Sequence, residues 1–341
     1  MAEYKLTLLG FGNVGKALAR LLKRKENELN KELDIQYRIV AVATGSHGRA
    51  INPEGLNIDE LLSTLEKGDS LDALSTISAP SDNLAFIQAS GADVLFENTP
   101  VSYEDGQPAI DHIKEALSEN MHVATANKGP VVHGYRELSD LALSRDKKFF
   151  FESTVMDGAP VFSVFRVLPA ANIQSISGVL NSTTNLILSQ MEEGNSFGDA
   201  VAYAQSIGIA ETDPSGDVDG WDAAIKISAL IAVLMNTPYT PEMVEREGIR
   251  NITPGKIAAA KAAGKRWKLV CTARREGNKI SAKVSPQMVD PRNPMFTVDG
   301  TTSIVQVETD VLGKLSLIED DPGPHTTAYG LLADFINSVQ E

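Results

Sequence analysis

The stretch that decides the fold is Gly10-Phe11-Gly12-Asn13-Val14-Gly15, which has glycine at its first, third and sixth positions. An apolar run, Tyr4–Leu9, precedes it, and apolar residues recur at helical spacing from Ala17 to Leu22. This order predicts a strand, a tight turn and a helix, the context in which three such glycines bind a dinucleotide. We expect the first glycine to make the turn, the second to let a pyrophosphate approach the backbone amides, and the third to allow close helix–strand packing. All six residues are therefore candidate cofactor-binding residues.

Strand-like and helix-like segments alternate through the first 150 residues. Strand candidates are Tyr37–Ala43, Val94–Phe96, His122–Thr125 and Lys148–Glu152, and helix candidates are Pro108–Ser118 and Tyr135–Ser144. This alternation predicts an α/β fold with a Rossmann-type, doubly wound parallel sheet.

The pattern changes after about residue 150. Strand candidates become Ser175–Leu180, Leu269–Arg274, Lys279–Met288 and Ser303–Thr309, with helices between residues 184 and 265. A second, α+β domain is expected, together with a last apolar helix, Thr326–Val339, that packs on the nearest sheet.

Composition excludes several classes of protein. The 341 residues are 43% hydrophobic and 22% charged, which is ordinary for a globular protein of about two domains. A net charge of −14 opposes binding to nucleic acid or an anionic membrane surface. The apolar run Ile225–Met235 is too short to span a membrane and contains a lysine. A single cysteine, Cys271, forms no internal disulfide, so a reducing cytoplasm is expected.

The end of the second strand bears on cofactor choice. NAD-selective sites place a carboxylate there, whereas residues 43–49 contain none. Ser46 and Arg49 suit a 2′-phosphate instead, so we expect NADP to be preferred over NAD. In the alternative interpretation Arg49 merely points to solvent.

Five carboxylates fall within twelve residues of the segment 211–222. A calcium-binding EF-hand is excluded, because Val218 and Ala224 stand where glycine and glutamate are required. Two interpretations stay open. One is a solvated acidic turn with an Asp222–Lys226 pair on a helix, and the other is a pocket for a cationic substrate group in which the lysine moves a proton.

Six segments in order resemble homoserine dehydrogenase. They are Ala126–Pro130, Glu152–Val155, Gly178–Leu188, Ala204–Glu211, the acidic run to Lys226, and Gly323–Ala328. The resemblance implies a homodimer that reversibly interconverts L-homoserine and L-aspartate 4-semialdehyde with NAD or NADP, in threonine, methionine and isoleucine biosynthesis. It also implies a dinucleotide-binding domain of residues 1–150 plus 318–341 and a catalytic and dimerisation domain of residues 151–317.

The same resemblance implies roles for single residues. Lys226 is the catalytic lysine and Lys128 the second lysine of the site. Substrate is held by Glu211, Asp217, Asp222 and Thr183. Thr99 approaches the nicotinamide of the cofactor, and Lys128 and Gly323 also approach the cofactor. Glu152 and Val155 hold a monovalent, sodium-like cation.

The chemistry requires a lysine with a lowered pKa, because Lys226 must accept the hydroxyl proton of the substrate. A second ammonium group about 5 Å away opposes protonation by about 3 kcal/mol at an effective dielectric of about 20. Lys128 is a candidate for that group, whereas Glu211 and Asp222 act in the opposite direction.

Two other functions are weighed against this one. Aspartate-semialdehyde dehydrogenase uses the same cofactor class, but Cys271 lies in an apolar run and is expected to be a buried hydrophobe rather than a nucleophile. A nucleotide sensor without activity would not need the two lysines and their carboxylates. The length leaves no room for a fused kinase or regulatory domain, so weak threonine feedback is expected.

Overall fold

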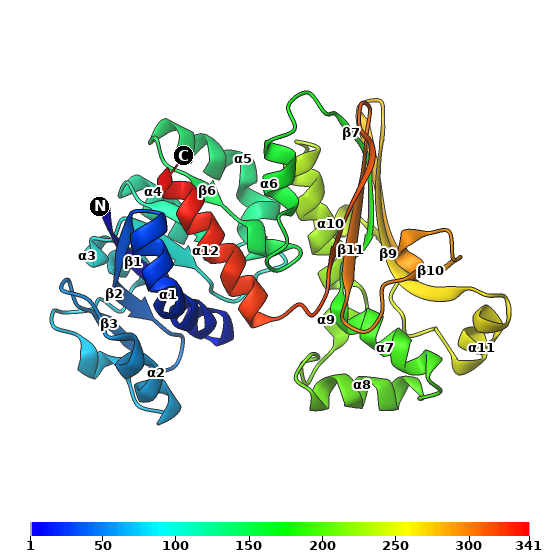
Figure 1. Ribbon diagram of the computed structural model, residues 1–341, viewed down its shortest axis with the longest axis horizontal. Coiled ribbons are helices and arrows are strands. Elements are labelled where there is room, and N and C mark those ends of the chain that lie inside the picture. Colours follow the sequence, from blue (N-terminus) through cyan, green and yellow to red (C-terminus); the bar gives the residue numbers. More distant parts are fainter. Residues whose placement is uncertain (1, 341) are drawn as a thin grey trace. The chain divides into compact units, whose positions relative to one another are not determined.

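The computed structural model describes residues 2–340 and divides into two compact units (Figure 1). The first unit contains the chain up to Pro160 and again from Gly323, and the second contains Val161–Pro322. Each unit is built on its own six-stranded sheet.

The first unit is an α/β unit whose sheet has the strand order β3-β2-β1-β4-β5-β6. The strands are β1 (Ala2–Leu9), β2 (Ile35–Ala43), β3 (Arg49–Ile51), β4 (Val94–Glu97), β5 (His122–Thr125) and β6 (Phe149–Phe150). The helices are α1 (Asn13–Glu32), α2 (Ile58–Glu66), α3 (Asn83–Ser90), α4 (Ala109–Ser118), α5 (Lys128–Ser144) and α12 (Pro324–Gln340), with short 3-10 turns η1 (Leu71–Leu74) and η2 (Glu152–Thr154). All neighbouring strands are parallel except β3, which runs antiparallel to β2. The expected Rossmann-type sheet is confirmed, and its order reverses between β1 and β4, where such sheets bind ligands.

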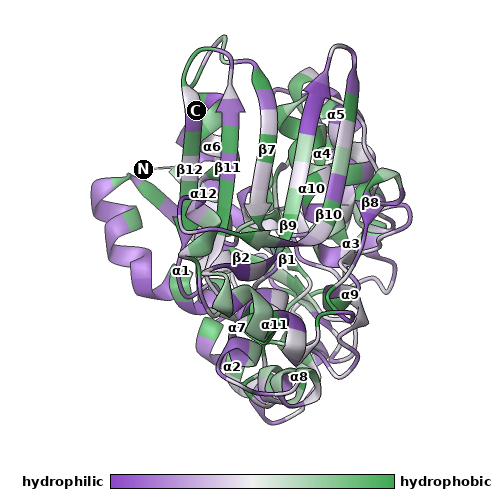
Figure 2. Ribbon diagram, turned by 90° about the vertical axis from the view of Figure 1, so that its right-hand side faces the viewer, coloured by the Kyte–Doolittle hydropathy of each residue, from purple (hydrophilic) through white to green (hydrophobic). Residues whose placement is uncertain are grey.

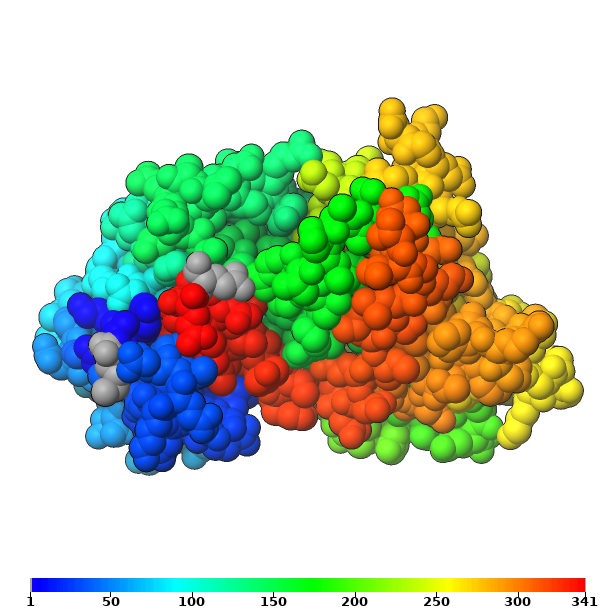
Figure 3. Space-filling model, turned by 45° about the horizontal axis from the view of Figure 1, so that its top comes forward, coloured from blue at the N-terminus to red at the C-terminus, as the bar shows by residue number. Residues whose placement is uncertain are grey.

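The C-terminal helix α12 completes the core of this unit. Phe335 is fully buried and packs edge to face on Tyr4 and Phe96, with ring centroids 5.9 and 6.1 Å apart. Figures 1 and 3 show α12, in red, beside the blue N-terminal part of the chain, in agreement with its packing on α1. The last helix therefore packs on the first sheet although the whole second unit precedes it in the sequence.

The second unit contains a mostly antiparallel sheet of order β12-β11-β7-β9-β10-β8, seen face on in Figure 2. The strands are β7 (Ile173–Val179), β8 (Glu245–Arg246), β9 (Arg266–Glu276), β10 (Lys279–Val289), β11 (Ser303–Thr309) and β12 (Gly313–Glu319). The helices are α6 (Val161–Arg166), α7 (Ser182–Glu192), α8 (Phe197–Ser206), α9 (Ser215–Val218), α10 (Trp221–Leu234) and α11 (Pro254–Ala262), with 3-10 turns η3 (Pro241–Met243) and η4 (Pro294–Phe296). The apolar helix α10 covers β9 and β10 and is buried along most of its length.

Some elements differ from the sequence prediction for local reasons. Helix α5 begins at Lys128 rather than Tyr135, because Asn127 caps it and Pro130 fits a first helical turn. The expected strand Lys148–Glu152 contains only two paired residues before η2. Edge strand β12 was not predicted, since none of its residues is buried and its hydrophobic signal is weak.

Candidate functional site

The three glycines of the first turn have different surroundings. Gly10 has φ +92°, and a Cβ there would overlap the carbonyl of Asn98. A Cβ on Gly15 would come within 2.7 Å of the Gly10 carbonyl oxygen, whereas one on Gly12 would meet no atom within 4 Å. Gly10 and Gly15 are therefore required by the packing of the protein itself. Gly12 faces open space, as a residue that a pyrophosphate approaches should.

A pocket of about 420 Å³ opens at this turn. It is lined by Gly10, Phe11, Gly12, Lys16, Thr44, Gly45, Ser46, His47, Leu65, Asn98, Thr99 and Pro100. No side chain caps the N-terminus of α1, so the amides there are available to an anion. Both polar atoms of the Asn98 side-chain amide are buried without a hydrogen-bond partner in the structure. The pocket thus lies at helix amides that no side chain caps, which is the arrangement that binds the pyrophosphate of a dinucleotide.

Lys16 is a pocket residue that the sequence reasoning missed. It lies in the first turns of α1 and lines the pocket, where its positive charge favours a phosphate group. The signal in the sequence was a basic residue directly after the last glycine of the turn.

The two residues expected at a 2′-phosphate are in different environments. Ser46 is exposed and lines the pocket, with its hydroxyl 2.8 Å from His47 Nδ1. The Arg49 guanidinium donates to the Pro80 carbonyl over 2.8 Å and lies over the Phe86 ring. Arg49 is thus bonded within the protein and does not line the pocket.

Three further predicted cofactor residues lie at ends of elements in the first unit. Thr99 follows β4 and lines the pocket, and the Asn127 side chain donates to its carbonyl over 3.0 Å. Lys128 is the half-buried first residue of α5, directly after that asparagine. Gly323 directly precedes α12, and its amide donates to Thr326 Oγ1 over 2.9 Å.

A partly buried cluster of Asp217, Asp222 and Lys226, here named the carboxylate–lysine cluster, forms in the second unit. Lys226 Nζ lies 3.1 Å from Asp222 Oδ2 and donates to the Leu180 carbonyl over 2.8 Å. The side chains of Lys226 and Asp222 are only 15% and 13% exposed. This exposure contradicts the solvated-turn interpretation of the pair and favours a binding pocket.

Asn181 joins the carboxylates of the cluster and is a second residue that sequence reasoning missed. Its side-chain nitrogen donates to Asp217 Oδ1 over 2.6 Å and to Asp222 Oδ2 over 3.0 Å. Its oxygen accepts from the amide of Thr184, which makes it the N-cap of α7 and fixes the orientation of its amide. An asparagine directly before an apolar helix was the available signal.

Burial and like charge both act on Asp217. Burial raises the pKa of its carboxyl, and the neighbouring Asp222 raises it further, whereas hydrogen bonds from Asn181 and the charge of Lys226 act in the opposite direction. The net direction is upward. An added cationic group beside the two carboxylates would therefore be stabilised, as expected of a site for an ammonium group.

The other predicted substrate residues divide into two groups. Thr183, in the first turn of α7, is buried, and its hydroxyl donates to the Ile209 carbonyl over 3.4 Å. It also acts to lower the pKa of Asp217. Glu211 is exposed in the segment after α8, where its carbonyl accepts from Gln205 over 3.0 Å. Two more acidic residues of the segment also have other partners: Asp213 accepts from the Ser215 amide, and Asp219 pairs with Arg250.

The residues predicted to hold a cation lie at η2. Glu152 is buried there, with its amide donating to Asp334 Oδ2 over 2.9 Å, and Val155 directly follows the turn. Among residues 2–340, no group of three or more histidine, cysteine or acidic side chains is arranged to hold a metal ion. The cation site stays a prediction.

Cys271 lies on β9 and is fully buried. Burial raises the pKa of its thiol to about 12. The thiolate needed for acyl transfer is therefore strongly disfavoured, as the sequence predicted.

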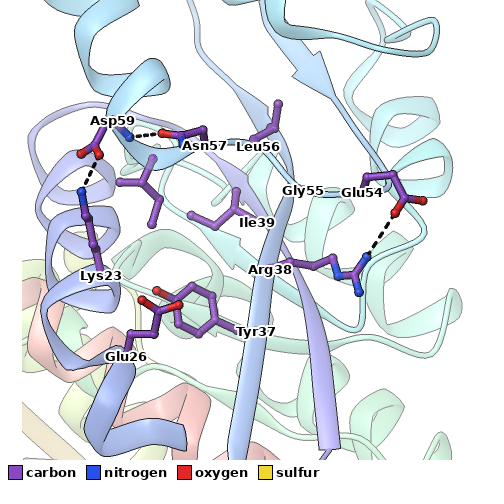
Figure 4. A pocket seen from close by; sticks show the side chains of 11 residues that line it. Lys23, Glu26, Tyr37, Arg38, Ile39, Glu54, Gly55, Leu56, Asn57 and Asp59 are labelled. Atoms are coloured by element: carbon purple, nitrogen blue, oxygen red, sulfur yellow. Dashed lines mark hydrogen bonds and ion pairs between the residues drawn. The ribbon is translucent and has the colours of Figure 1, made fainter.

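A second pocket of the first unit, about 410 Å³, lies between α1, β2 and α2 (Figure 4). Its charged side chains face one another: Lys23 pairs with Asp59 at 2.5 Å, and Arg38 lies 3.8 Å from Glu54. These pairs include four of the five charged side chains of the lining, the fifth being Glu26, and we assign no ligand to this pocket.

Across the described part of the chain, no helix has the length and apolar character needed to span a membrane.

Comparison with known proteins gives consistent matches over almost the whole chain. Residues 10–152 match the family model described as homoserine dehydrogenase, NAD binding domain, and residues 160–336 match the model described as homoserine dehydrogenase. The chain is 34% identical to the NAD(+)-dependent homoserine dehydrogenase of Pseudomonas canavaninivorans, over 100% of this chain and 97% of that protein. It is 35% identical to the homoserine dehydrogenase of Methanocaldococcus jannaschii, over 97% of both chains.

Solved structures agree with these matches. The crystal structure of a putative homoserine dehydrogenase from Archaeoglobus fulgidus superposes with a TM-score of 0.86 at 31% identity, covering 98% of both chains. That of the enzyme from Thermoplasma acidophilum superposes with a TM-score of 0.83 at 26% identity, covering 100% of both chains.

Proposed function

This chain belongs to the homoserine dehydrogenase family, and we propose that it interconverts L-homoserine and L-aspartate 4-semialdehyde with a nicotinamide dinucleotide. The observation that carries this proposal is the carboxylate–lysine cluster, in which a partly buried lysine lies beside two partly buried carboxylates. Carboxylates bind the ammonium group of an amino acid, and the lysine exchanges a proton with its alcohol.

In the proposed mechanism each residue of the cluster has one task. Asp217 and Asp222 bind the substrate ammonium group, and Thr183 supports Asp217. Lys226, oriented by Asp222 and the Leu180 carbonyl, removes the proton from the hydroxyl group and returns it in the reverse reaction. The bound dinucleotide supplies the hydride chemistry.

The proton transfer requires Lys226 in its neutral form. Without substrate, the negative charge of Asp222 favours the protonated form instead. We propose that the substrate ammonium group compensates Asp222 and, on the family resemblance, that Lys128 is the second lysine of the active site. Glu211 is proposed as a further substrate ligand and Gly323 as a cofactor contact, on the family resemblance.

We propose that the cofactor, a nicotinamide dinucleotide, binds at the pocket of the glycine turn. Whether it is NADP or NAD is a separate question. NADP preference is supported by Lys16 and Ser46 in the pocket lining. It is opposed by the bonds that hold Arg49 and by the similarity of the chain to the NAD(+)-dependent homoserine dehydrogenase of Pseudomonas canavaninivorans. Comparing kcat/KM with NADP and with NAD tests the preference, and a clear advantage for NAD would refute it.

The test of the main proposal is reduction of each dinucleotide, followed by absorbance at the nicotinamide band, with homoserine as the sole substrate. Turnover that needs homoserine supports the proposal, and no turnover with either dinucleotide refutes it. A homodimer, a cytoplasmic location and a bound monovalent cation remain predictions. The homodimer is tested by the molar mass in solution and the location by cell fractionation. The cation is tested by activity with and without sodium.

A further inference from the structure

A buried carboxylate that the proposed mechanism does not use lies under the dinucleotide pocket. Glu97, the last residue of β4, has 0% exposure. Its Oε1 accepts from both the amide and the hydroxyl of Thr99, and lies 3.4 Å from Nδ1 of the buried His112 on α4. Thr125 Oγ1 lies 3.4 Å from its Oε2 and donates over 2.7 Å to the main-chain carbonyl of Glu97. A carboxylate in this environment requires donors, and Thr99, which lines the pocket, supplies two of them.

The contacts continue beyond His112 to the surface. His112 Nε2 lies 3.1 Å from Asn83 Nδ2 at the start of α3, and Asn83 Oδ1 lies 3.4 Å from a guanidinium nitrogen of Arg49. We name Arg49, Asn83, His112, Glu97 and Thr99 the hydrogen-bond chain. It connects β3, α3, α4 and the loop after β4 within the first unit.

The chemistry of its members fixes the direction of the hydrogen-bond chain. Arginine only donates, so the Asn83 oxygen accepts and its nitrogen donates to His112 Nε2. A ring nitrogen that accepts carries no proton, and hence the His112 proton lies on Nδ1 and is donated to Glu97. Donation thus runs in one direction, from the Arg49 cation to the Glu97 carboxylate.

The loop that Glu97 holds, Asn98–Pro100, is also in contact with the glycine turn. The Asn98 amide donates to the Leu9 carbonyl over 2.8 Å, and the Asn98 carbonyl occupies the space that a Cβ of Gly10 would need. Asn127, next to Lys128, donates to the Thr99 carbonyl from the other side. A shift of Thr99 would therefore move one wall of the pocket.

We propose that Glu97 and His112 are positioning residues that fix Thr99, which the family resemblance places at the nicotinamide, in the wall of the dinucleotide pocket, with Asn83 and Arg49 as their outer supports. This inference rests on the proposed function for the identity of the ligand. In this proposal Arg49 does not recognise a phosphate group. Its guanidinium donates to Asn83 and so supports the hydrogen-bond chain, and it acts on the cofactor only through that chain.

The test distinguishes binding of the nicotinamide part of the cofactor from binding of its ADP-ribose part. Dissociation constants are measured for NADH or NADPH, whichever binds more tightly, from nicotinamide fluorescence, and for ADP-ribose, which lacks nicotinamide, by competition. His112→Phe removes both ring nitrogens and is expected to raise the Kd of the reduced dinucleotide about tenfold, the effect of losing a hydrogen bond to a charged group. The Kd of ADP-ribose should stay within about twofold, because the hydrogen-bond chain ends at Thr99.

His112→Asn is the conservative variant, since its amide takes the place of the Nδ1 donor. It should restore most of the affinity for the reduced dinucleotide. If His112→Phe does not fold, Asn83→Ala removes the outer donor at a half-buried position and should give a smaller rise of the same kind. The matched control is Gln88→Ala, which breaks a 2.6 Å bond between the same two helices, to Glu115, without touching the hydrogen-bond chain.

The inference is overturned if the variants weaken both probes equally, which would indicate general damage, or weaken neither. A wild-type chain that binds neither probe refutes the proposed function itself. Nitrogen-15 NMR of the His112 ring is an independent readout that needs no cofactor: the neutral tautomer protonated at Nδ1 is expected, and the Nε2-protonated form would contradict the direction derived above.

Discussion

Asp217→Asn is expected to stabilise the protein at neutral pH and to weaken homoserine binding. Asn181 Nδ2 lies 2.6 Å from Asp217 Oδ1 and 3.0 Å from Asp222 Oδ2, and the sum of these distances limits the separation of the two carboxylate oxygens to 5.6 Å. Two negative charges that far apart repel by about 3 kcal/mol at an effective dielectric of about 20. Lys226, 3.1 Å from Asp222, offsets part of this repulsion, so the expected gain in unfolding free energy is about 1 kcal/mol.

The pH dependence of this gain follows from the raised pKa of Asp217. Below the ordinary carboxyl pKa of about 3.9, Asp217 is protonated in the folded and the unfolded chain, and the repulsion is absent. As the pH rises through the higher pKa of the folded state, the carboxyl ionises against burial and Asp222, and its contribution to stability is lost. The advantage of the asparagine variant should therefore be small near pH 4 and full at pH 8.

Urea unfolding at both pH values measures the effect, with homoserine KM determined on the same samples. Asp222→Asn is the matched control: it leaves Lys226 without its ion-pair partner and should destabilise the protein. An Asp217→Asn variant that is less stable than the wild type at pH 8, or equally stabilised at both pH values, would refute the reasoning.

Three further outcomes are expected. Lys226→Ala should lower kcat at least about a hundredfold with an unchanged dinucleotide Kd; retained turnover would remove Lys226 from the mechanism. Gly12→Ala should fold normally and bind the dinucleotide at least about tenfold more weakly in a fluorescence titration, since its Cβ points into open space, whereas Gly10→Ala should lose stability through its φ of +92°; the reverse ranking would contradict the assigned roles. Phe335→Ala should cost about 3–5 kcal/mol in denaturant unfolding, and a cost below about 1 kcal/mol would show that α12 is not part of the core.

The sequence by itself determined the first unit well, because its signals are local. The glycine turn needs a positive φ at Gly10 and close packing at Gly15, and both requirements can be identified within six residues. The alternation of apolar segments then predicted the parallel sheet. The i,i+4 spacing of Asp222 and Lys226 likewise predicts that both side chains lie on one face of a helix, as they do.

Tertiary structure decided which polar groups meet. Asn181 contacts Asp217 and Asp222 across 36 and 41 residues of sequence. The sequence suggested that Arg49 binds a phosphate group or points to solvent. In the structure its guanidinium donates to Asn83, which connects it to the buried His112 and Glu97. Local spacing in the sequence fixes the backbone conformation of a segment. The partner of a buried charge depends instead on which distant segments the packing of sheets and helices brings within about 3 Å. No sequence pattern encodes that distance.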